Sequence, residues 1–323
     1  MRIIQIALAL IALFYGVATA GEKTVKLMAI GNSFSRNALK FLPEIVTASG
    51  NHLIVKHAMI GGCDFERHMR HADAFEANPH APEGRPYEGK FSLKDLLVAE
   101  QWQYVTIQQA SPKSFRPETF HPHADRLIAY IRKYAPQAEI IIHQTWAYRD
   151  DHAFWGLKNF NTDSMYKGVR ETYDALAKER SLRQVPSGDA MEAARQDPTW
   201  GKFVPDPDFN PKTAHYPELP KNEKRSLHIG YTWKEHKPSN TYKLGWDKFH
   251  ANAHGEYLQG CVWFEFFFEQ SVVGNTFVPQ NIAPADAAIL QHIAHRVVTE
   301  KYRPRPLTNE ASEPLSLSTK QAN

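Results

Sequence analysis

Three residues of this 323-residue chain have the types and spacing that activate a hydroxyl group for attack: Ser33, Asp247 and His250. A serine hydroxyl is a poor nucleophile until a base takes its proton, and that base needs an acceptor that orients its other ring nitrogen. Asp247 and His250 lie three positions apart, so the carboxylate can meet imidazole Nδ1 while Nε2 faces Ser33. We therefore take Ser33 as candidate nucleophile, His250 as base and Asp247 as its orienting acceptor.

Ser33 lies between an apolar run at 25–30, a candidate strand, and a helical pattern at 37–49. In an open parallel sheet, ligands bind beyond the carboxyl ends of the strands. The free amide groups at a helix N-terminus also favour developing negative charge. The alternative is that Ser33 or Ser35 only caps the helix, and this segment alone does not separate the two interpretations.

Two further strand ends carry hydrogen-bond donors. The second candidate strand, 53–60, runs into Gly62, where glycine allows a backbone amide to approach a substrate oxygen closely; a plain turn is the alternative. Gln108 and Gln109 follow the third candidate strand, 104–107, and a carboxamide there either donates to an oxyanion or merely closes a turn. Alternation along a strand sends the two glutamines to opposite faces.

Polar and aromatic residues at the same sheet edge are candidates for substrate binding. His143 ends the fourth candidate strand, 139–143, and Trp146 follows it, so both are expected to face the mouth of the site. The candidate substrate-binding residues are Asn32, Gln109, His143 and Trp146.

Histidines are numerous enough to raise the question of a metal site. No His-x-x-x-His pair or carboxylate partner at zinc spacing accompanies them, and catalytic zinc generally takes three protein ligands. We therefore expect no metal and no other cofactor. The motif around His68 places that residue either near the site or in a hydrogen bond to the turn at 63–67. The histidines considered are 68, 71, 80, 121, 123, 143 and 152.

The elements that must position these residues follow an alternating pattern of strand and helix. Strand followed by helix, repeated, predicts an α/β three-layer sandwich with a parallel sheet of about five strands, covered on both faces. The expected strands are 25–30, 53–60, 104–107, 139–143 and 182–185. The expected helices are 37–49, 93–100, 124–134, 164–179 with Asp163 as cap, 189–195, 257–268 and 283–300.

Residues 197–246 break the alternating pattern. Seven prolines and several aromatic residues stand among polar ones, and the stretch is too long for an ordinary connection. We expect an irregular, ordered excursion or lid. Its aromatic residues either stack on sugar rings or pack the excursion onto the domain, and normal aromatic burial favours packing. These residues are Trp200, Tyr216, Tyr231, Trp233 and Tyr242.

The two ends of the chain differ from its middle. Residues 1–20 resemble a signal peptide with cleavage near Ala20, which predicts a secreted or periplasmic protein; a retained anchor is the alternative. A domain at 21–305 and a flexible polar tail at 306–323 follow. The formal charge is +3 without a basic stripe, which argues against nucleic acid as a partner. Cys63 and Cys261 either pair or remain thiols.

Taken in order, these motifs resemble the SGNH (GDSL-like) serine hydrolase superfamily. That superfamily has a Gly-Asp-Ser-like turn after the first strand, a glycine after the second, a donor side chain after the third and Asp-x-x-His near the end. The details are similar to its DUF4886 branch. The motifs are IGNSFS (30–35), GGCDFERH (61–68), IQQAS (107–111), TWAY (145–148) and DKFHANAHGEYLQGCVWFE (247–265).

The resemblance implies roles for individual residues. Ser33 is the nucleophile, His250 the general base and Asp247 its orienter. The amides of Ser33 and Gly62 form the oxyanion hole together with a glutamine side chain. Asn32 stands where the superfamily usually has Asp. The superfamily's third block, Gly-x-Asn-Asp, is absent from this chain. Gln108 or Gln109 must then replace the missing Asn. Gln108 is preferred, because a glutamine at this position is the one most regularly found in the DUF4886 branch.

The function expected is an exported serine esterase that hydrolyses carboxylic esters through an acyl-enzyme, with O-acetyl groups on carbohydrates as the suggested substrate. The partner is then a small-molecule or polysaccharide ester, and no stable membrane span is expected in the mature protein. A non-catalytic carbohydrate-binding protein on the same fold would bind sugar without turnover. A metal-dependent hydrolase would lose activity with a chelator and tolerate Ser33→Ala.

Overall fold

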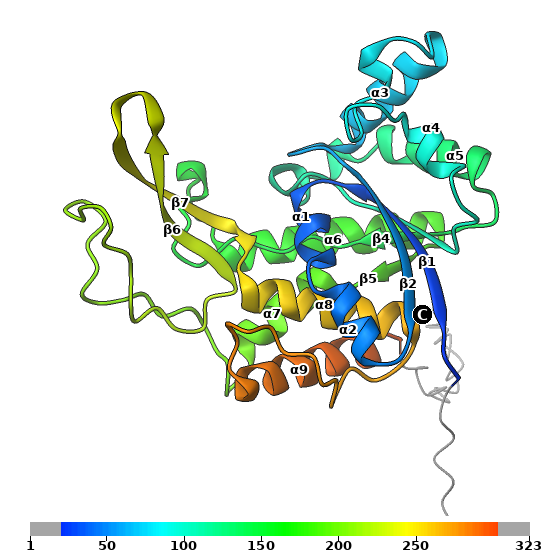
Figure 1. Cartoon of the computed structure of the whole chain (residues 1–323). Helices are drawn as coiled ribbons and strands as arrows, with labels where there is room; N and C mark the ends of the chain where they lie inside the picture. The colour runs from blue at the N-terminus through cyan, green and yellow to red at the C-terminus, as the bar shows by residue number, and fades with distance from the viewer. Residues whose placement is uncertain (1–20, 303–323) are drawn as a thin grey trace, which may run out of the picture.

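A computed structural model describes residues 21–302, and its centre is a five-stranded parallel sheet in the order β2-β1-β3-β4-β5 (Figure 1). This flavodoxin-like order confirms the predicted α/β sandwich. The predicted signal peptide at 1–20 and tail at 306–323 lie outside the described residues. The strands are β1 (Thr24–Gly31), β2 (His52–Met59), β3 (Tyr104–Ile107), β4 (Glu139–His143) and β5 (Arg183–Val185).

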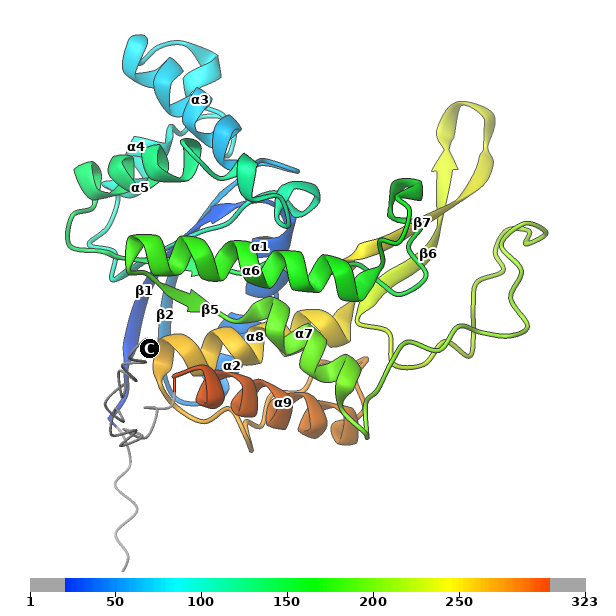
Figure 2. The same ribbon diagram turned by 180° about the vertical axis from the view of Figure 1, so that it is seen from behind.

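Helices cover both faces of the sheet. Figure 1 shows α3, α4 and α5 gathered on one side and α1, α2, α8 and α9 on the other. Helix α6 runs beside α5, to which the Arg180–Asp125 ion pair ties it (Figure 2). The helices are α1 (Ser33–Leu39), α2 (Leu42–Ala48), α3 (Phe65–Ala77), α4 (Leu93–Leu97), α5 (His123–Tyr134), α6 (Thr162–Arg180), α7 (Ser187–Gln196), α8 (Ala253–Phe268) and α9 (Pro284–Tyr302).

The strand register brings the carboxyl ends together at one edge. Ile30 at the end of β1 pairs with Ile107 at the end of β3, and Ile107 pairs with Ile142 of β4. The central strands are buried almost throughout, as expected for a sheet covered on both faces. The loops that follow β1, β2, β3 and β4 therefore share one rim, and this rim holds the predicted site.

Several helix predictions differ from the structure; among them, α8 begins at Ala253 and not at 257, and α4 ends at Leu97 and not at 100. The helix expected at 37–49 is two short helices, α1 and α2, separated at Lys40 and Phe41. Pro43 has no N–H to continue the first helix and is tolerated in the first turn of the second. Helix α6 begins two residues earlier than expected, and its cap is Asn161, whose side chain accepts from Ser164 N–H, not Asp163. Helix α3 was not predicted, although its buried residues Phe65, His68, Met69, Ala72 and Phe75 have helical spacing.

The prediction for 197–246 was partly wrong, because the second half of this stretch is a β-hairpin. Strands β6 (His228–His236) and β7 (Thr241–Ala251) pair antiparallel and project from the carboxyl end of the sheet (Figures 1 and 2). Trp200 is buried, while Tyr216 stacks on Tyr242 with ring centroids 3.6 Å apart. Alternating polar and apolar residues at 228–236 carried a strand signal, which the many prolines upstream obscured.

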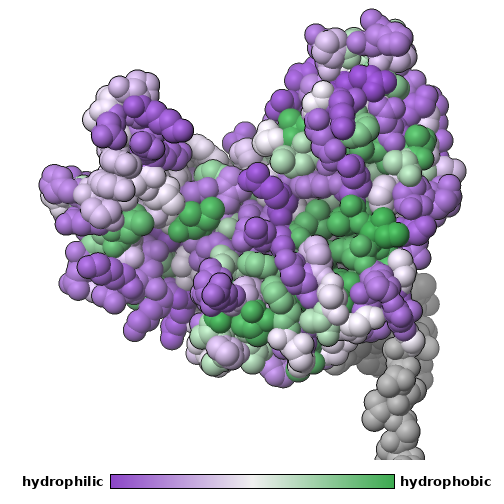
Figure 3. Space-filling model, in the orientation of Figure 1, coloured by the Kyte–Doolittle hydropathy of each residue, from purple (hydrophilic) through white to green (hydrophobic). Residues whose placement is uncertain are grey.

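The surface is mostly hydrophilic, with separate hydrophobic patches, one of them over the edge strand β2 (Figure 3). Cys63 and Cys261 are both buried free thiols, which settles the question that the sequence left open. Within residues 21–302, no helix is long and apolar enough to cross a bilayer.

Candidate active site

The structure brings the three candidate catalytic residues together. His250 Nε2 lies 2.6 Å from Ser33 Oγ, and His250 Nδ1 lies 2.7 Å from Asp247 Oδ2. The chain separates Ser33 from His250 by 217 positions, so only the fold creates this contact. When the imidazole is neutral and donates Nδ1–H to the carboxylate, its Nε2 is free to accept the serine proton.

A bulge in β7 makes the pairing of Asp247 with His250 possible. Gly230 pairs with Asp247 while His228 pairs with Ala251, so three residues of β7 (248–250) stand opposite one residue of β6 (229). In a regular strand, residues three apart point to opposite faces and lie about 10 Å apart. The extra residues bend the strand and redirect its side chains. The bulge thus turns the carboxylate and the imidazole toward each other.

The loop that follows β4 fixes the bulged segment in place. Trp146 Nε1 donates to the Phe249 carbonyl at 2.9 Å, and the Arg149 N–H donates to the Lys248 carbonyl at 2.9 Å. Both acceptors stand between Asp247 and His250 in the chain. The two hydrogen bonds therefore hold the backbone that carries the acid and the base.

Charged side chains strengthen the same junction. Arg149 is buried and binds the Asp151 carboxylate through two nitrogens at 2.7 and 3.0 Å. Its third contact is the Glu223 carboxylate, and Lys248 Nζ lies 2.9 Å from Asp151 Oδ2. Burial alone would raise the pKa of Asp151, but the bonds from Arg149 and Lys248 outweigh burial and lower it. A buried pair stabilises only when its polar atoms are satisfied, as they are here.

The Asp247 carboxylate is set to remain ionised. Burial acts to raise its pKa, but hydrogen bonds from the His250 ring and from the backbone N–H groups of His250 and Phe249 bring the pKa below its ordinary value. A charged carboxylate beside the imidazole stabilises the imidazolium that forms when the base takes a proton. The electrostatics of the pair therefore suit a general base.

Ser33 occupies the first turn of α1, and the capping alternative is wrong. Asn32 is the N-cap, because its side-chain oxygen accepts from the Phe34 N–H at 3.0 Å. Ser33 Oγ is left to meet His250. Ser35 is fully buried, and its hydroxyl donates to the Asn32 carbonyl. The N–H of Ser33 lies where a helix supplies no internal acceptor.

Gly62 and Ser33 both line the cavity described below. The Gly62 φ of +61° is in the left-handed region, which favours glycine. Within residues 21–302, the Gly62 N–H donates no hydrogen bond to the backbone, so it is free to meet a substrate oxygen. This placement agrees with the oxyanion-hole role that the sequence resemblance implied for the Gly62 amide.

The structure places Gln108 behind the cavity wall and not on it, where the predicted oxyanion donor was expected. Its Nε2 donates to Asn32 Oδ1 at 2.8 Å, and its Oε1 lies 2.7 Å from His143 Nδ1. The side chain is buried and does not line the cavity. Gln108 instead orients Asn32, whose own Nδ2 donates to the Cys63 carbonyl. The sequence placed this glutamine at the correct sheet edge but could not show which groups would bind its amide.

Three of the four predicted substrate-binding residues also lie behind the cavity wall. Gln109 accepts from the N–H groups of Phe65 and Ala110 and donates to the Thr119 carbonyl. His143 and Trp146 are fully buried. These residues support the site from beneath, and only Asn32 of the predicted set reaches the wall.

A cavity of about 340 Å³ opens beside Ser33 and His250, and its lining is mainly aromatic and apolar. Sequence reasoning missed most of these residues, because they follow β3 and β4 or lie on β7 and carry no recognisable catalytic spacing. The TWAY motif contained Tyr148 and the IQQAS motif contained Ser111, but neither was assigned a role. The lining residues are Asn32, Ser33, Phe34, Gly62, Ala110, Ser111, Pro112, Tyr148, His152, Trp155, Trp246, Phe249 and His250.

The histidines that raised the metal question are dispersed. His68 is buried with Nδ1 2.8 Å from the Tyr87 hydroxyl, and His121 pairs with Asp125 and Glu179 on the surface. Within residues 21–302, no three His, Cys, Asp or Glu side chains are grouped so that they could hold a metal ion. The His68 side chain does not line the cavity, and its backbone N–H donates to the Asp64 carbonyl at 3.0 Å, which is the predicted hydrogen bond to the turn at 63–67.

Comparisons with known proteins agree with this architecture. A DUF4886 family protein from Bacteroides uniformis ATCC 8492 is 26% identical, covers 88% of this chain and 98% of its own, and superposes with a TM-score of 0.66. A provisionally assigned SGNH hydrolase from Slackia heliotrinireducens (16% identity, 75% and 98% coverage) scores 0.44. A provisionally assigned GDSL-like lipase from Parabacteroides merdae ATCC 43184 (12%, 77% and 98%) scores 0.42. At these scores the last two carry no conclusion about activity, and no curated protein matches the chain.

The family itself is identified by sequence. The profile described as "Domain of unknown function (DUF4886)" matches residues 26–206, more than half of the chain. This range contains Ser33 and Gly62 but ends before the hairpin that carries Asp247 and His250. On this match, the chain belongs to the DUF4886 family.

Proposed function

We propose that the protein is a serine esterase that hydrolyses carboxylic esters through an acyl-enzyme. The observation that carries the proposal is the chain of contacts from Ser33 Oγ to His250 Nε2 at 2.6 Å and from His250 Nδ1 to Asp247 Oδ2 at 2.7 Å, beside an open cavity. A nucleophile within hydrogen-bond reach of a base, whose other nitrogen is oriented by an acid, is the arrangement that activates serine.

Each step of the reaction has a residue to perform it. Ser33 Oγ attacks the ester carbonyl carbon while its proton passes to His250 Nε2, and Asp247 stabilises the resulting imidazolium. The tetrahedral intermediate collapses, the bond to the alcohol oxygen breaks, and that oxygen takes the proton from His250. A water molecule then loses its proton to His250, attacks the acyl-serine carbon and releases the acid and the Ser33 hydroxyl.

The negative charge that develops on the carbonyl oxygen requires donors. The N–H groups of Ser33 and Gly62 supply two, and Ser111 takes the place that the sequence assigned to Gln108. Ser111 lines the cavity with its hydroxyl 2.9 Å from that of Tyr148. Burial raises the pKa of Tyr148 to about 12, so the phenol stays protonated at neutral pH. When Tyr148 donates to Ser111, the Ser111 proton is free for the oxyanion.

The test is hydrolysis of p-nitrophenyl acetate by residues 21–323, comparing wild type with Ser33→Ala, each with and without a chelator. Ser239→Ala is the matched control, because Ser239 is exposed at the hairpin tip. The proposal requires activity that resists the chelator, survives in the control and is lost in Ser33→Ala. Equal activity of wild type and Ser33→Ala, or no activity in either, rejects it. Chelator-sensitive activity would favour a metal-dependent hydrolase.

The finer predictions on substrate and location stay proposals. O-acetyl groups on carbohydrates remain the suggested substrate, and the cavity of about 340 Å³ is within the range of small-molecule sites. Export rests on residues 1–20 alone. Secretion of a fusion to a reporter through these residues, lost when the apolar run is interrupted by charged residues, tests it.

A further inference from the structure

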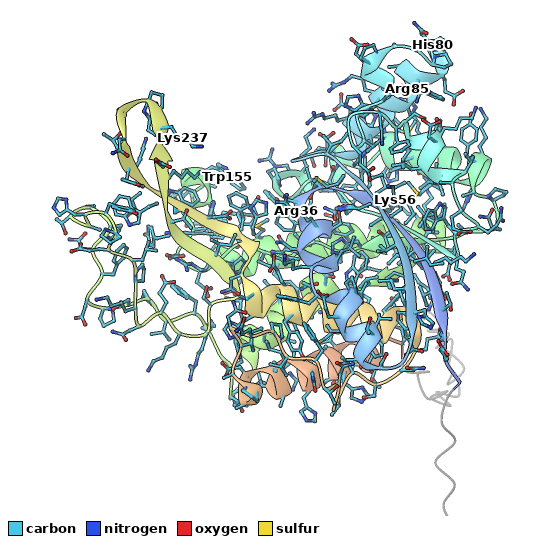
Figure 4. All side chains as sticks on the ribbon, in the orientation of Figure 1. Arg36, Lys56, His80, Arg85, Trp155 and Lys237 are labelled. Atoms are coloured by element: carbon cyan, nitrogen blue, oxygen red, sulfur yellow. The ribbon has the colours of Figure 1, made fainter. Side chains whose placement is uncertain are left out.

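Two tryptophans at the mouth of the candidate active site expose half of their side chains. Trp155 is 52% exposed and Trp246 is 49% exposed, and both line the cavity next to Ser33 and His250. Figure 4 shows Trp155 between the base of the hairpin and the body of the molecule. Exposed aromatic surface in a concave site marks a place where a ligand is bound.

The backbone that carries Trp155 adopts an unfavourable conformation. Phe154, Trp155 and Gly156 have φ values of +45°, +57° and +70°, three successive residues in the left-handed region. A non-glycine residue there costs on the order of 1–3 kcal/mol, and such strain is concentrated at ligand sites. Packing offsets it here, because Phe154 is buried with its ring 5.7 Å from that of Phe160. The strained turn holds an indole at the cavity mouth.

His152 lies between the two indoles and offers a polar group. Its ring centroid is 5.4 Å from that of Trp155 and 5.3 Å from that of Trp246, edge to face with both. The Phe154 N–H donates to His152 Nδ1 at 2.7 Å, so a neutral ring carries its proton on Nε2. Burial, together with the Lys248 cation, lowers the pKa of His152 and favours that neutral ring. The Nε2–H is available as a donor.

The cavity wall carries no formal charge. None of its lining residues is Asp, Glu, Lys or Arg. The nearby Lys248 ammonium is bound to the Asp151 carboxylate at 2.9 Å. A charged ligand would lose its water without gaining a partner, which is unfavourable. The site therefore suits a neutral group that has apolar faces and polar edges.

We propose that Trp155, Trp246 and His152 form a subsite for the alcohol half of the ester, and that this half is a neutral sugar ring. The C–H face of a pyranose packs against an indole, while a ring hydroxyl accepts a hydrogen bond from His152 Nε2. This inference rests on the proposed function, since it names the substrate class of the same site. The three subsite residues are distinct from the candidate catalytic residues Ser33, Asp247 and His250.

The experiment compares three acetyl esters: methyl 6-O-acetyl-glucopyranoside, cyclohexyl acetate and glyceryl triacetate. The first has a ring with hydroxyls, the second a ring without them and the third no ring. The variants are Trp155→Ala, Trp246→Ala and His152→Phe, each with a thermal melt to check folding. Tyr242→Ala is the control, because Tyr242 is exposed on the same hairpin outside the cavity.

The expected result is a rise in KM for the sugar ester of about tenfold in each tryptophan variant, equivalent to about 1.4 kcal/mol, with kcat little changed. Trp155→Phe should recover part of the loss. His152→Phe should raise KM for the sugar ester but not for cyclohexyl acetate. Glyceryl triacetate and the Tyr242→Ala control should be unaffected throughout.

Three outcomes overturn the subsite: no hydrolysis of the sugar ester by wild type, tryptophan variants that leave its KM unchanged, or equal effects on the sugar ester and glyceryl triacetate. A preference for cyclohexyl acetate would assign the subsite to apolar rings instead of sugars. Failure of the proposed function looks different, because hydrolysis of glyceryl triacetate would then be independent of Ser33. A Ser33-dependent esterase without a ring preference keeps the function and rejects only the subsite.

Discussion

His250 transfers every proton in the proposed reaction, and Asp247 determines which of its nitrogens is free to do so. An Asp247→Asn variant would keep the shape of the site, but its amide can donate to Nδ1 and so place the imidazole proton on Nε2. We expect kcat to fall by about a thousandfold or more. Steady-state kinetics on p-nitrophenyl acetate measure this effect. The exposed Asp208 provides the control variant Asp208→Asn, and a kcat equal to that of the control would contradict the assignment of Asp247.

Ser111 had no predicted role and is the proposed third donor to the oxyanion. If its hydroxyl donates to the oxyanion, Ser111→Ala lowers kcat by about a hundredfold with little change in KM, because the bond forms only in the transition state. Tyr148→Phe should have a smaller effect, since it removes only the partner that orients Ser111. An unchanged kcat in Ser111→Ala would leave the two backbone amides as the complete set of donors.

At the scale of elements, the reactive geometry depends on the bulge in β7 and on the loop that holds it. Trp146→Phe removes the donor to the Phe249 carbonyl. We expect the free energy of unfolding to fall by about 1–3 kcal/mol and kcat to fall by about tenfold, because the backbone between Asp247 and His250 loosens. Urea denaturation and steady-state kinetics measure the two effects.

Trp263→Phe is the matched control for that variant. Trp263 is also fully buried, and its Nε1 donates to Ser187 Oγ at 3.2 Å, away from β7. It should destabilise the fold without lowering kcat. If both variants lower kcat in proportion to their loss of stability, the hydrogen bond to Phe249 has no special part in positioning the base.

The elements also show which parts of the site the sequence could reveal. Strand periodicity and turn residues predicted the five strands and the rim that they share, so the positions of Ser33 and Gly62 followed directly. The hairpin was missed because a bulge and long-range contacts from Trp146 and Arg149 define it, and neither leaves a local pattern. The sequence did not show that Gln108 lies behind the cavity wall, because its partners, Asn32 and His143, come from two other strand ends.

At the scale of the whole molecule, the fold buries several histidines in neutral form. Burial lowers the pKa of His68 and His143 to about 3 and that of His228 to about 4. The unfolded chain takes up these protons near pH 6.5, whereas the folded chain does not. The contribution of these histidines to the free energy of unfolding is therefore fully present above pH 6.5 and is lost as the pH falls toward 3 or 4. At pH 5 each of these histidines lowers the free energy of unfolding by about 2 kcal/mol.

Urea denaturation at pH 7 and pH 5 tests this pH dependence. His143→Gln should reduce the difference between the two pH values, because glutamine does not titrate. Ser33→Ala is the control, since it changes no titratable side chain with a shifted pKa. If the free energy of unfolding changes equally between pH 7 and pH 5 in wild type and in His143→Gln, His143 takes up its proton in the folded state at the same pH as in the unfolded chain, which contradicts the prediction.

The central claim is that Ser33 is an activated nucleophile, and covalent labelling by a fluorophosphonate tests it most directly. The reagent forms a stable bond with a serine only where a base has made the hydroxyl nucleophilic. Intact-mass and peptide analysis should show one label per chain, on the peptide that contains Ser33, and none in Ser33→Ala or in His250→Ala. Labelling of a different residue, or an unlabelled wild-type protein that nevertheless hydrolyses esters, would contradict the account.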